Sequence, residues 1–326
     1  MCNPFTRAAS GALSRGSTGV EEVFPVPKRN RGMRRRVVRF PGWLVALLGA
    51  ATLLHSAPVT IPFSPRDGRV FLPAQVNGTG PLTFLLDSGY ELIMLNPSHA
   101  QSLGLRRVGG VTIVGIAGEE RAETFGGVMF DFGGTQYQPR RVAALPSDAR
   151  KRGRDGVLGS GFFKRFVVEI DSRAGQVRLH EPAEFHYDGS GEVLPLTFNG
   201  DVPVIEVGLA LTNQPALARL KIDTGCDGGV CLGCGFVQQQ GWTNAPGRGA
   251  STRSGVGGGT RTRRVQLAQV ELGRLSTAHV GAHLFDSASP GGDGVAGHLG
   301  MEVLKRFTVI FDYAGKRLIL EAYPAR

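Results

Sequence analysis

Two short segments of the sequence place an aspartate before a hydroxyl residue and a glycine. The first is Asp87-Ser88-Gly89, after the apolar run Leu82–Leu86. The second is Asp223-Thr224-Gly225, at the end of another strand-like run. A buried strand would fix each carboxylate, the hydroxyl could hydrogen-bond across to hold a neighbouring acid, and glycine lets two loops approach closely. Two carboxylates held together would share one proton and act as general base and general acid.

Either tripeptide alone could simply form a turn, but the chain around them is duplicated. Segment 155–179 recurs as 297–320, with an offset of 141 between Lys164 and Lys305. The two aspartate motifs match at an offset of 136, and Ile61–Phe63 matches Leu194–Leu196. Three blocks in the same order indicate a tandem repeat. If the two copies face each other across a pseudo-twofold axis, Asp87 and Asp223 meet.

The composition favours an all-β protein with short helices. The chain of 326 residues contains 48 glycines and 19 prolines and has few long helix-forming runs. Strands are expected over 70–76, 82–86, 111–116, 128–132, 166–170 and 177–179. One or two helical turns are expected over 97–103, 160–165 and 301–306. The turn-rich segment 188–192 separates the copies, which gives an N-terminal lobe of residues 58–190 and a C-terminal lobe of residues 191–326.

From about residue 60 to 322, the chain resembles the retropepsin-like aspartic peptidases. The resemblance rests on the two aspartate motifs and on a turn that follows them after 72 residues in one copy and 77 in the other. It implies two duplicated β-barrel lobes related by a pseudo-twofold axis, with Asp87 and Asp223 catalytic. It also implies that a turn packs beneath each catalytic loop. The turn residues are Val157, Leu158 and Gly159 in the first copy, and Leu299 and Gly300, preceded by His298, in the second.

Three residues depart from the family pattern. Tyr90 and Cys226 follow the catalytic glycines, where the family usually has a small residue, and His298 replaces an aliphatic residue in the second turn. Segment 295–297, which reads Val-Ala-Gly, offers a competing register for that turn.

The family closes its cleft with a glycine-tipped hairpin called the flap. Each copy has a candidate, so we expect a symmetric pair rather than a single flap, although ordinary surface hairpins would explain the same glycines. The candidate flap residues are Gly115, Ile116, Ala117 and Gly118 in the first copy, and Gly255, Val256, Gly257 and Gly258 in the second.

Most of the formal charge of +10 lies in the leader. Residues 1–57 hold nine Lys or Arg and two acids, which leaves 28 basic and 25 acidic residues for 58–326. This nearly neutral body argues against a nucleic-acid partner. Residues 33–57 combine an arginine cluster with the apolar run 43–54, as in an export signal or an uncleaved membrane anchor. Residues 1–32 are expected to be disordered, or to precede a true start at Met33.

Three cysteines, Cys226, Cys231 and Cys234, lie within nine residues. In an exported protein they could form one local disulfide and leave one free thiol, or all three could be buried thiols. A metal or redox site is a third possibility, although zinc would need a fourth ligand that no histidine nearby in the sequence supplies.

The sequence therefore predicts an aspartic endopeptidase, periplasmic or secreted, that acts on peptides or unfolded proteins. A single chain supplies both carboxylates, which favours a monomer, and the reaction needs no metal or cofactor. The main alternative is an inactive peptide- or protein-binding module with Tyr90 filling the catalytic space. The spacing of Gly159-Ser160-Gly161 does not fit a serine nucleophile elbow, and no zinc-protease helix motif is present.

Overall fold

The computed structural model describes residues 57–63, 65–115, 118–147, 153–211, 215–286 and 294–324. The leader assignments for residues 1–32 and 33–56, including the apolar run 43–54, lie outside these residues. Among the described helices, none has the length and apolar character needed to cross a membrane.

The N-terminal lobe is built on a sheet with the strand order β5-β6-β9-β4-β10-β3-β2-β7-β8. Most pairings are antiparallel, but β10 lies parallel to β3, the strand that leads to Asp87. Helices α1 (Pro97–Ser102) and α2 (Ser160–Arg165) follow β4 and β10. The strands are β2 (Phe71–Val76), β3 (Thr79–Leu86), β4 (Met94–Leu95), β5 (Arg106–Gly115), β6 (Gly118–Gly126), β7 (Phe130–Asp131), β8 (Gln136–Tyr137), β9 (Val142–Ala144) and β10 (Gly156–Leu158).

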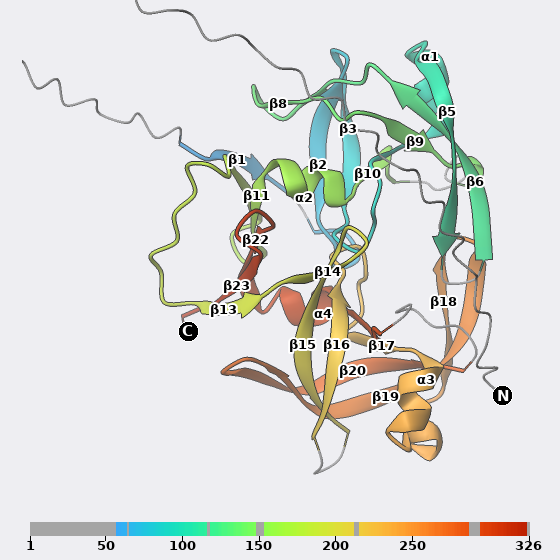
Figure 1. Ribbon diagram of the computed structural model, residues 1–326, viewed down its shortest axis with the longest axis vertical. Helices are drawn as coiled ribbons and strands as arrows, with labels where there is room; N and C mark the ends of the chain where they lie inside the picture. Colours follow the sequence, from blue (N-terminus) through green and yellow to red (C-terminus); the bar gives the residue numbers. More distant parts are fainter. Residues whose placement is uncertain are drawn as a thin grey trace, which may run out of the picture. The chain divides into compact units, whose positions relative to one another are not determined.

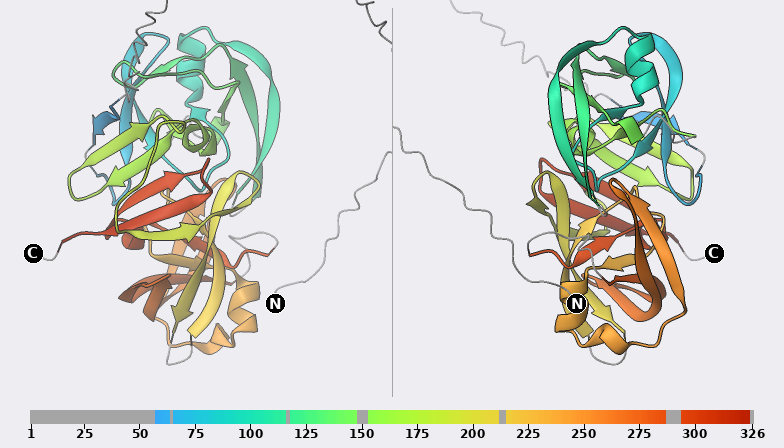
Figure 2. Two further views of the ribbon diagram at one scale, coloured as in Figure 1. Left: turned by 60° about the vertical axis from the view of Figure 1, so that its left-hand side comes forward. Right: turned by 90° about the vertical axis from the view of Figure 1, so that its right-hand side faces the viewer.

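The C-terminal lobe repeats this arrangement in the order β14-β15-β16-β21-β17-β20-β19-β18, and a further β15–β19 pairing curls the sheet onto itself. Strand β21 lies parallel to β16, which leads to Asp223. The elements are β14 (Thr197–Asn199), β15 (Val202–Ala210), β16 (Pro215–Ile222), β17 (Val230–Leu232), α3 (Cys234–Gln239), the 3₁₀ helix η2 (Trp242–Asn244), β18 (Ala250–Gly255), β19 (Gly258–Leu272), β20 (Leu275–Phe285), β21 (Gly297–Leu299) and α4 (Met301–Leu304). Figure 2 shows the lobes as two bodies of strands, coloured blue to green and yellow to orange.

A third sheet joins the lobes and carries the symmetry of the duplication. Its order is β1-β12-β11-β22-β23-β13, so that each copy contributes three strands. At its centre β11 and β22 pair antiparallel, and Glu169 lies opposite Ile310. Ile310 is also the residue that corresponds to Glu169 in the second copy, at the repeat offset of 141. A pseudo-twofold axis therefore passes between these two residues. The strands are β1 (Val59–Pro62), β11 (Val167–Asp171), β12 (Gln176–His180), β13 (Glu192–Pro195), β22 (Phe307–Asp312) and β23 (Arg317–Ala322).

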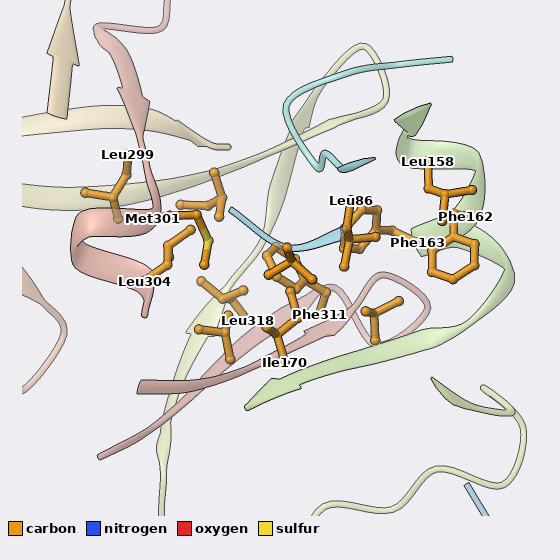
Figure 3. Close-up of a cluster of buried hydrophobic side chains, with 14 of the residues drawn as sticks. Leu86, Leu158, Phe162, Phe163, Ile170, Leu299, Met301, Leu304, Phe311 and Leu318 are labelled. Carbon is orange, nitrogen blue, oxygen red and sulfur yellow. The ribbon is translucent and has the colours of Figure 1, made fainter. Parts of the chain in front are cut away.

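One continuous apolar core runs through both lobes and the joining sheet. Figure 3 shows Leu86 and Leu158 on one side of it, Leu299 and Met301 on the other, and Phe311 between them. The Phe163 and Phe311 rings meet edge to face at 4.9 Å, which links the two copies directly. This shared core lies beneath the strand ends that carry the two aspartates, so those ends rest on a rigid base.

The fold class expected from the sequence, all-β with duplicated lobes and short helices, is confirmed. The predicted helix over 160–165 matches α2, and the helix predicted over 301–306 is shorter, ending at Leu304. The strand predicted over 111–116 begins earlier, at Arg106, because Gly109 and Gly110 both pair with β6 and the chain passes an irregularity between Arg107 and Gly109 without leaving the sheet.

Candidate active site

The two aspartates occupy equivalent positions at the ends of parallel strand pairs. The backbone N–H of Asp87 donates to the Leu158 carbonyl at 3.0 Å, and that of Asp223 donates to the Leu299 carbonyl at 2.9 Å. In both lobes the turn strand pairs with the strand before the aspartate, with Leu158 opposite Leu86 and Leu299 opposite Ile222. This register identifies His298-Leu299-Gly300 as the counterpart of Val157-Leu158-Gly159 and excludes the competing register at 295–297.

The hydroxyls of Ser88 and Thr224 connect the two aspartate loops reciprocally. The Ser88 N–H donates to Thr224 Oγ1 at 2.9 Å, and the Thr224 N–H donates to Ser88 Oγ at 3.1 Å. Each hydroxyl also donates across the lobes, from Ser88 to the Ile222 carbonyl at 2.7 Å and from Thr224 to the Leu86 carbonyl at 2.8 Å. Both side chains are buried. The expectation that they hold the opposite acid directly is wrong, because they clamp the opposite backbone instead.

Each loop glycine lies against the carboxylate of the other lobe. A Cβ atom added to Gly89 would lie 2.6 Å from Asp223 Cγ, and one added to Gly225 would lie 2.3 Å from Asp87 Cγ. Real Cβ atoms do not approach other atoms this closely, so any side chain at either position would push the carboxylates apart. Glycine is therefore required here for space, as the sequence suggested.

Burial and mutual repulsion set the protonation of the pair. Burial raises the pKa of Asp87 well above its ordinary value, and the charge of Asp223, with which it shares a hydrogen bond, raises it further. Burial also raises the pKa of Asp223, while the nearby His298 opposes that rise. His298 Nε2 lies 3.9 Å from Asp223 Oδ2. The pair therefore keeps one proton into a pH range where an isolated aspartate would be ionised, with the negative charge favoured on Asp223.

This environment predicts a pH-dependent effect of Asp87→Asn on stability. At about pH 3, below the ordinary aspartate pKa, the wild-type carboxyl is neutral in both folded and unfolded chains, so the substitution should change little. As the pH rises from the ordinary aspartate pKa towards the raised pKa of folded Asp87, the unfolded wild-type chain ionises first, so the folded state loses stability. The Asp87→Asn variant has no carboxyl at this position and does not lose it. At about pH 7 we expect the variant to unfold about 2–4 °C higher, or more. Thermal unfolding at both pH values, with Asp131→Asn as the control, tests this; an equal change at both values would contradict it.

The residues after the two loop glycines play matching structural roles. The Tyr90 carbonyl accepts from the N–H of Ser160 at 2.7 Å, and the Cys226 carbonyl accepts from that of Met301 at 2.8 Å. Each loop thus holds the first turn of the helix beneath it. The Tyr90 ring packs against the apolar cluster that contains Leu85 and Val157. The close approach of each loop glycine to the opposite carboxylate leaves no space for this ring between the loops.

Both candidate flaps are glycine-tipped hairpins, formed by β5–β6 and β18–β19, and Figure 1 shows the ends of the two hairpins approaching each other. A Cβ atom on Gly115 would lie 2.3 Å from the Val256 carbonyl oxygen, and one on Gly118 would lie 3.6 Å from the Cα of Gly257. Val256 also packs against the N-terminal apolar cluster. Gly255 and Gly258 pair at the base of the second tip, while Ile116 and Ala117 lie outside the described residues.

Beside Asp223 lies a group of residues that the sequence did not bring together. Cys226 and Cys231 are both free thiols, so the expected local disulfide is wrong. Their hydrogen bond lowers the pKa of Cys226 and raises that of Cys231. His298 lies directly across the β17–β21 pair from Cys231. His298 lies far from the cysteines in sequence, so the cysteine spacing does not reveal it. Alignment of the two turns in register is the sequence signal that points to it.

The paired strand-end aspartates and the inter-lobe sheet define the class of protein as an aspartic proteinase fold. Residues 72–162 match the family model described as aspartyl protease. The structure is similar to that of the aspartic proteinase from Irpex lacteus, with a TM-score of 0.55 and 14% sequence identity, over 82% of this chain and 97% of that one. No curated protein matches in sequence. The family match over residues 72–162 and the shared fold agree with the resemblance to the retropepsin-like aspartic peptidases that the sequence indicated.

Proposed function

We propose that this protein is an aspartic endopeptidase in which Asp87 and Asp223 activate one water molecule between them. The observation that carries the proposal is the pair itself: two half-buried carboxyls, one from each lobe, each lying against the loop glycine of the other lobe and each with a raised pKa. The reciprocal Ser88 and Thr224 bonds hold their loops together. A purely structural role would not require two mutually repelling acids to lie side by side in a partly buried site.

The reaction follows from the shared proton. His298 favours the negative charge on Asp223, so Asp223 is the base that takes a proton from the water, and Asp87 is the acid that protonates the peptide carbonyl oxygen. The resulting tetrahedral diol collapses when Asp223 passes its proton to the amide nitrogen, Asp87 takes a proton from one hydroxyl, and the C–N bond breaks. The carboxyl pair then holds one proton again, and no covalent intermediate forms.

The substrate class follows from the two hairpins near the pair. A peptide bound in extended form could pair with the hairpin strands, as in other cases of strand addition. Val256 and the Tyr90 ring supply apolar surface. We therefore propose peptides or unfolded proteins with hydrophobic side chains near the scissile bond. One chain supplies both carboxylates, so a monomer suffices, and we place the enzyme in an exported compartment on the basis of its leader sequence.

The hairpin tips should control substrate access. The Cβ of Gly115→Ala would lie 2.3 Å from the Val256 carbonyl oxygen, so the tips would have to separate. We expect a KM increase of about tenfold, since about 1.4 kcal/mol of lost binding corresponds to that factor. Steady-state kinetics test this, with Gly235→Ala on α3, whose added Cβ would meet no atom within 4 Å, as the control. An unchanged KM for the Gly115 variant would show that the hairpins do not take part in substrate binding.

Digestion of an unstructured protein by the full-length chain tests the proposed function directly. Mass spectrometry should find new internal termini whose number grows with time. The competing binding module predicts that the same protein is retained by the chain without new termini. That result would overturn the proposal.

A further inference from the structure

Three potential metal ligands converge at the base of the second catalytic loop. They are Cys226, which follows the loop glycine, Cys231 on β17 and His298 on β21. One ligand atom from each lies within 4.8 Å of the others, and all three residues are buried. Asp223, on the same loop, places Oδ2 3.9 Å from His298 Nε2.

The N-terminal lobe shows that the fold does not need these residue types. Tyr90 stands in that lobe where Cys226 stands in the other, and the Met94–Val157 pair across β4–β10 corresponds to the Cys231–His298 pair. Met94 and Val157 are buried in an apolar cluster, and Tyr90 packs against it. One lobe thus has an ordinary hydrophobic contact where its copy has two thiols and an imidazole. Packing alone does not account for a simultaneous change to these three types.

We propose that Cys226, Cys231 and His298 bind Zn²⁺, with the Asp223 carboxylate as the fourth ligand. Zinc in proteins prefers tetrahedral sets of cysteine, histidine and carboxylate, with bonds of about 2.0–2.3 Å. Such bonds place ligand atoms about 3.3–3.8 Å apart. The 3.9 Å separation of His298 and Asp223 and the separations of up to 4.8 Å among the other three ligand atoms therefore require a small inward movement of side chains.

The charges around the cluster fit a bound dication. On binding, both thiols release their protons to solvent, and no oxidant or reductant is involved. Zn²⁺ with two thiolates and one carboxylate carries one net negative charge, and Arg253 offsets it. Arg253 Nη2 lies 3.2 Å from Cys226 Sγ and 2.6 Å from Asp227 Oδ1, so the guanidinium is already held as an outer partner of the sulfur.

A zinc ion in this position would act on the proposed peptidase. Coordination withdraws Asp223 from the water-activating pair, so the metal-loaded chain cannot use it as a base. The site therefore makes the enzyme reversibly inhibited by zinc and reactivated by a chelator. This consequence rests on the proposed function, whereas metal binding itself does not.

The first experiment measures metal binding by the full-length, reduced chain. Equilibrium dialysis should give one Zn²⁺ per chain, and replacement by Co²⁺ should produce the thiolate-to-cobalt charge-transfer absorption of a tetrahedral sulfur site. His298→Val installs the residue of the N-terminal lobe, and Cys231→Ala removes one thiol. We expect either variant to weaken zinc binding by more than about 100-fold, since losing even an outer-shell partner costs about 10- to 100-fold. The exposed His279→Gln serves as the control.

Absence of stoichiometric binding, absence of the cobalt–thiolate band, or equal binding by wild type and both variants would overturn the proposal. Circular dichroism confirms that each variant is folded before its affinity is compared. In the cleavage assay, zinc should inhibit the wild type and leave Cys231→Ala active at the same concentration, with each rate compared with that of the same protein without zinc. If the chain binds zinc through these residues but never cleaves peptides, the proposed peptidase function would be wrong and the proposed zinc site would stand.

Discussion

Asp87→Asn and Asp223→Asn should each reduce peptide cleavage by at least about 10³-fold, the range that positioned acid–base groups contribute. An amide can neither take a proton from the water nor lend one to the carbonyl oxygen. Since the two carboxyls act as a unit, the double variant should be scarcely less active than either single one. Initial rates on one unstructured substrate, measured at the pH of maximum activity, provide the comparison.

Asp131→Asn is the matched control for this comparison, because it makes the same chemical change on β7, away from the pair, and should retain wild-type activity. If one aspartate could be replaced without loss while the other could not, the shared-proton mechanism would be wrong. If neither mattered, the catalytic site would have to lie elsewhere.

Thr224→Ala should destabilise the protein by about 2–6 kcal/mol and also lower activity. The Thr224 hydroxyl accepts from the Ser88 N–H and donates to the Leu86 carbonyl, both across the lobes. Its removal leaves two buried polar groups without partners, at a cost of about 1–3 kcal/mol each. Denaturant unfolding measures the loss, and kcat reports whether the loops still hold the carboxyls together.

Thr224→Ser keeps the hydroxyl and removes only a methyl group, so its stability should lie much closer to that of the wild type. Equal destabilisation by serine and alanine would mean that packing, rather than the hydrogen bonds, holds the loops together.

The architecture could be predicted from the sequence because the duplication is visible in it. The 141-residue offset between Lys164 and Lys305 recurs as the pairing of Glu169 with Ile310 at the pseudo-twofold axis. The apolar segments before Asp87 and Asp223 predicted the strands that carry them. A glycine after each hydroxyl residue indicated that the two loops approach each other closely. The structure shows this approach as the contact of Gly89 with the carboxylate of Asp223.

Other features depend on contacts that are distant in sequence. The partners of the Ser88 and Thr224 hydroxyls are backbone groups of the opposite lobe, and residue type does not reveal which group a hydroxyl will meet. His298 joins the cysteines only through the antiparallel pairing of β17 with β21. The sequence shows that His298 replaces an aliphatic residue in the turn motif, but it does not show which side chains His298 contacts.

The most direct test of the central claim is active-site titration of the full-length chain with a pepstatin-type inhibitor, whose central hydroxyl mimics the water-derived oxygen of the tetrahedral intermediate. Cleavage of an unstructured protein would be followed from about pH 3 to about pH 8, since paired carboxyls can be tuned across acidic to near-neutral values. The paired-aspartate mechanism predicts cleavage that falls to zero at one inhibitor per chain. A folded wild-type protein that cleaves at no pH, or cleaves without being inhibited, would contradict it.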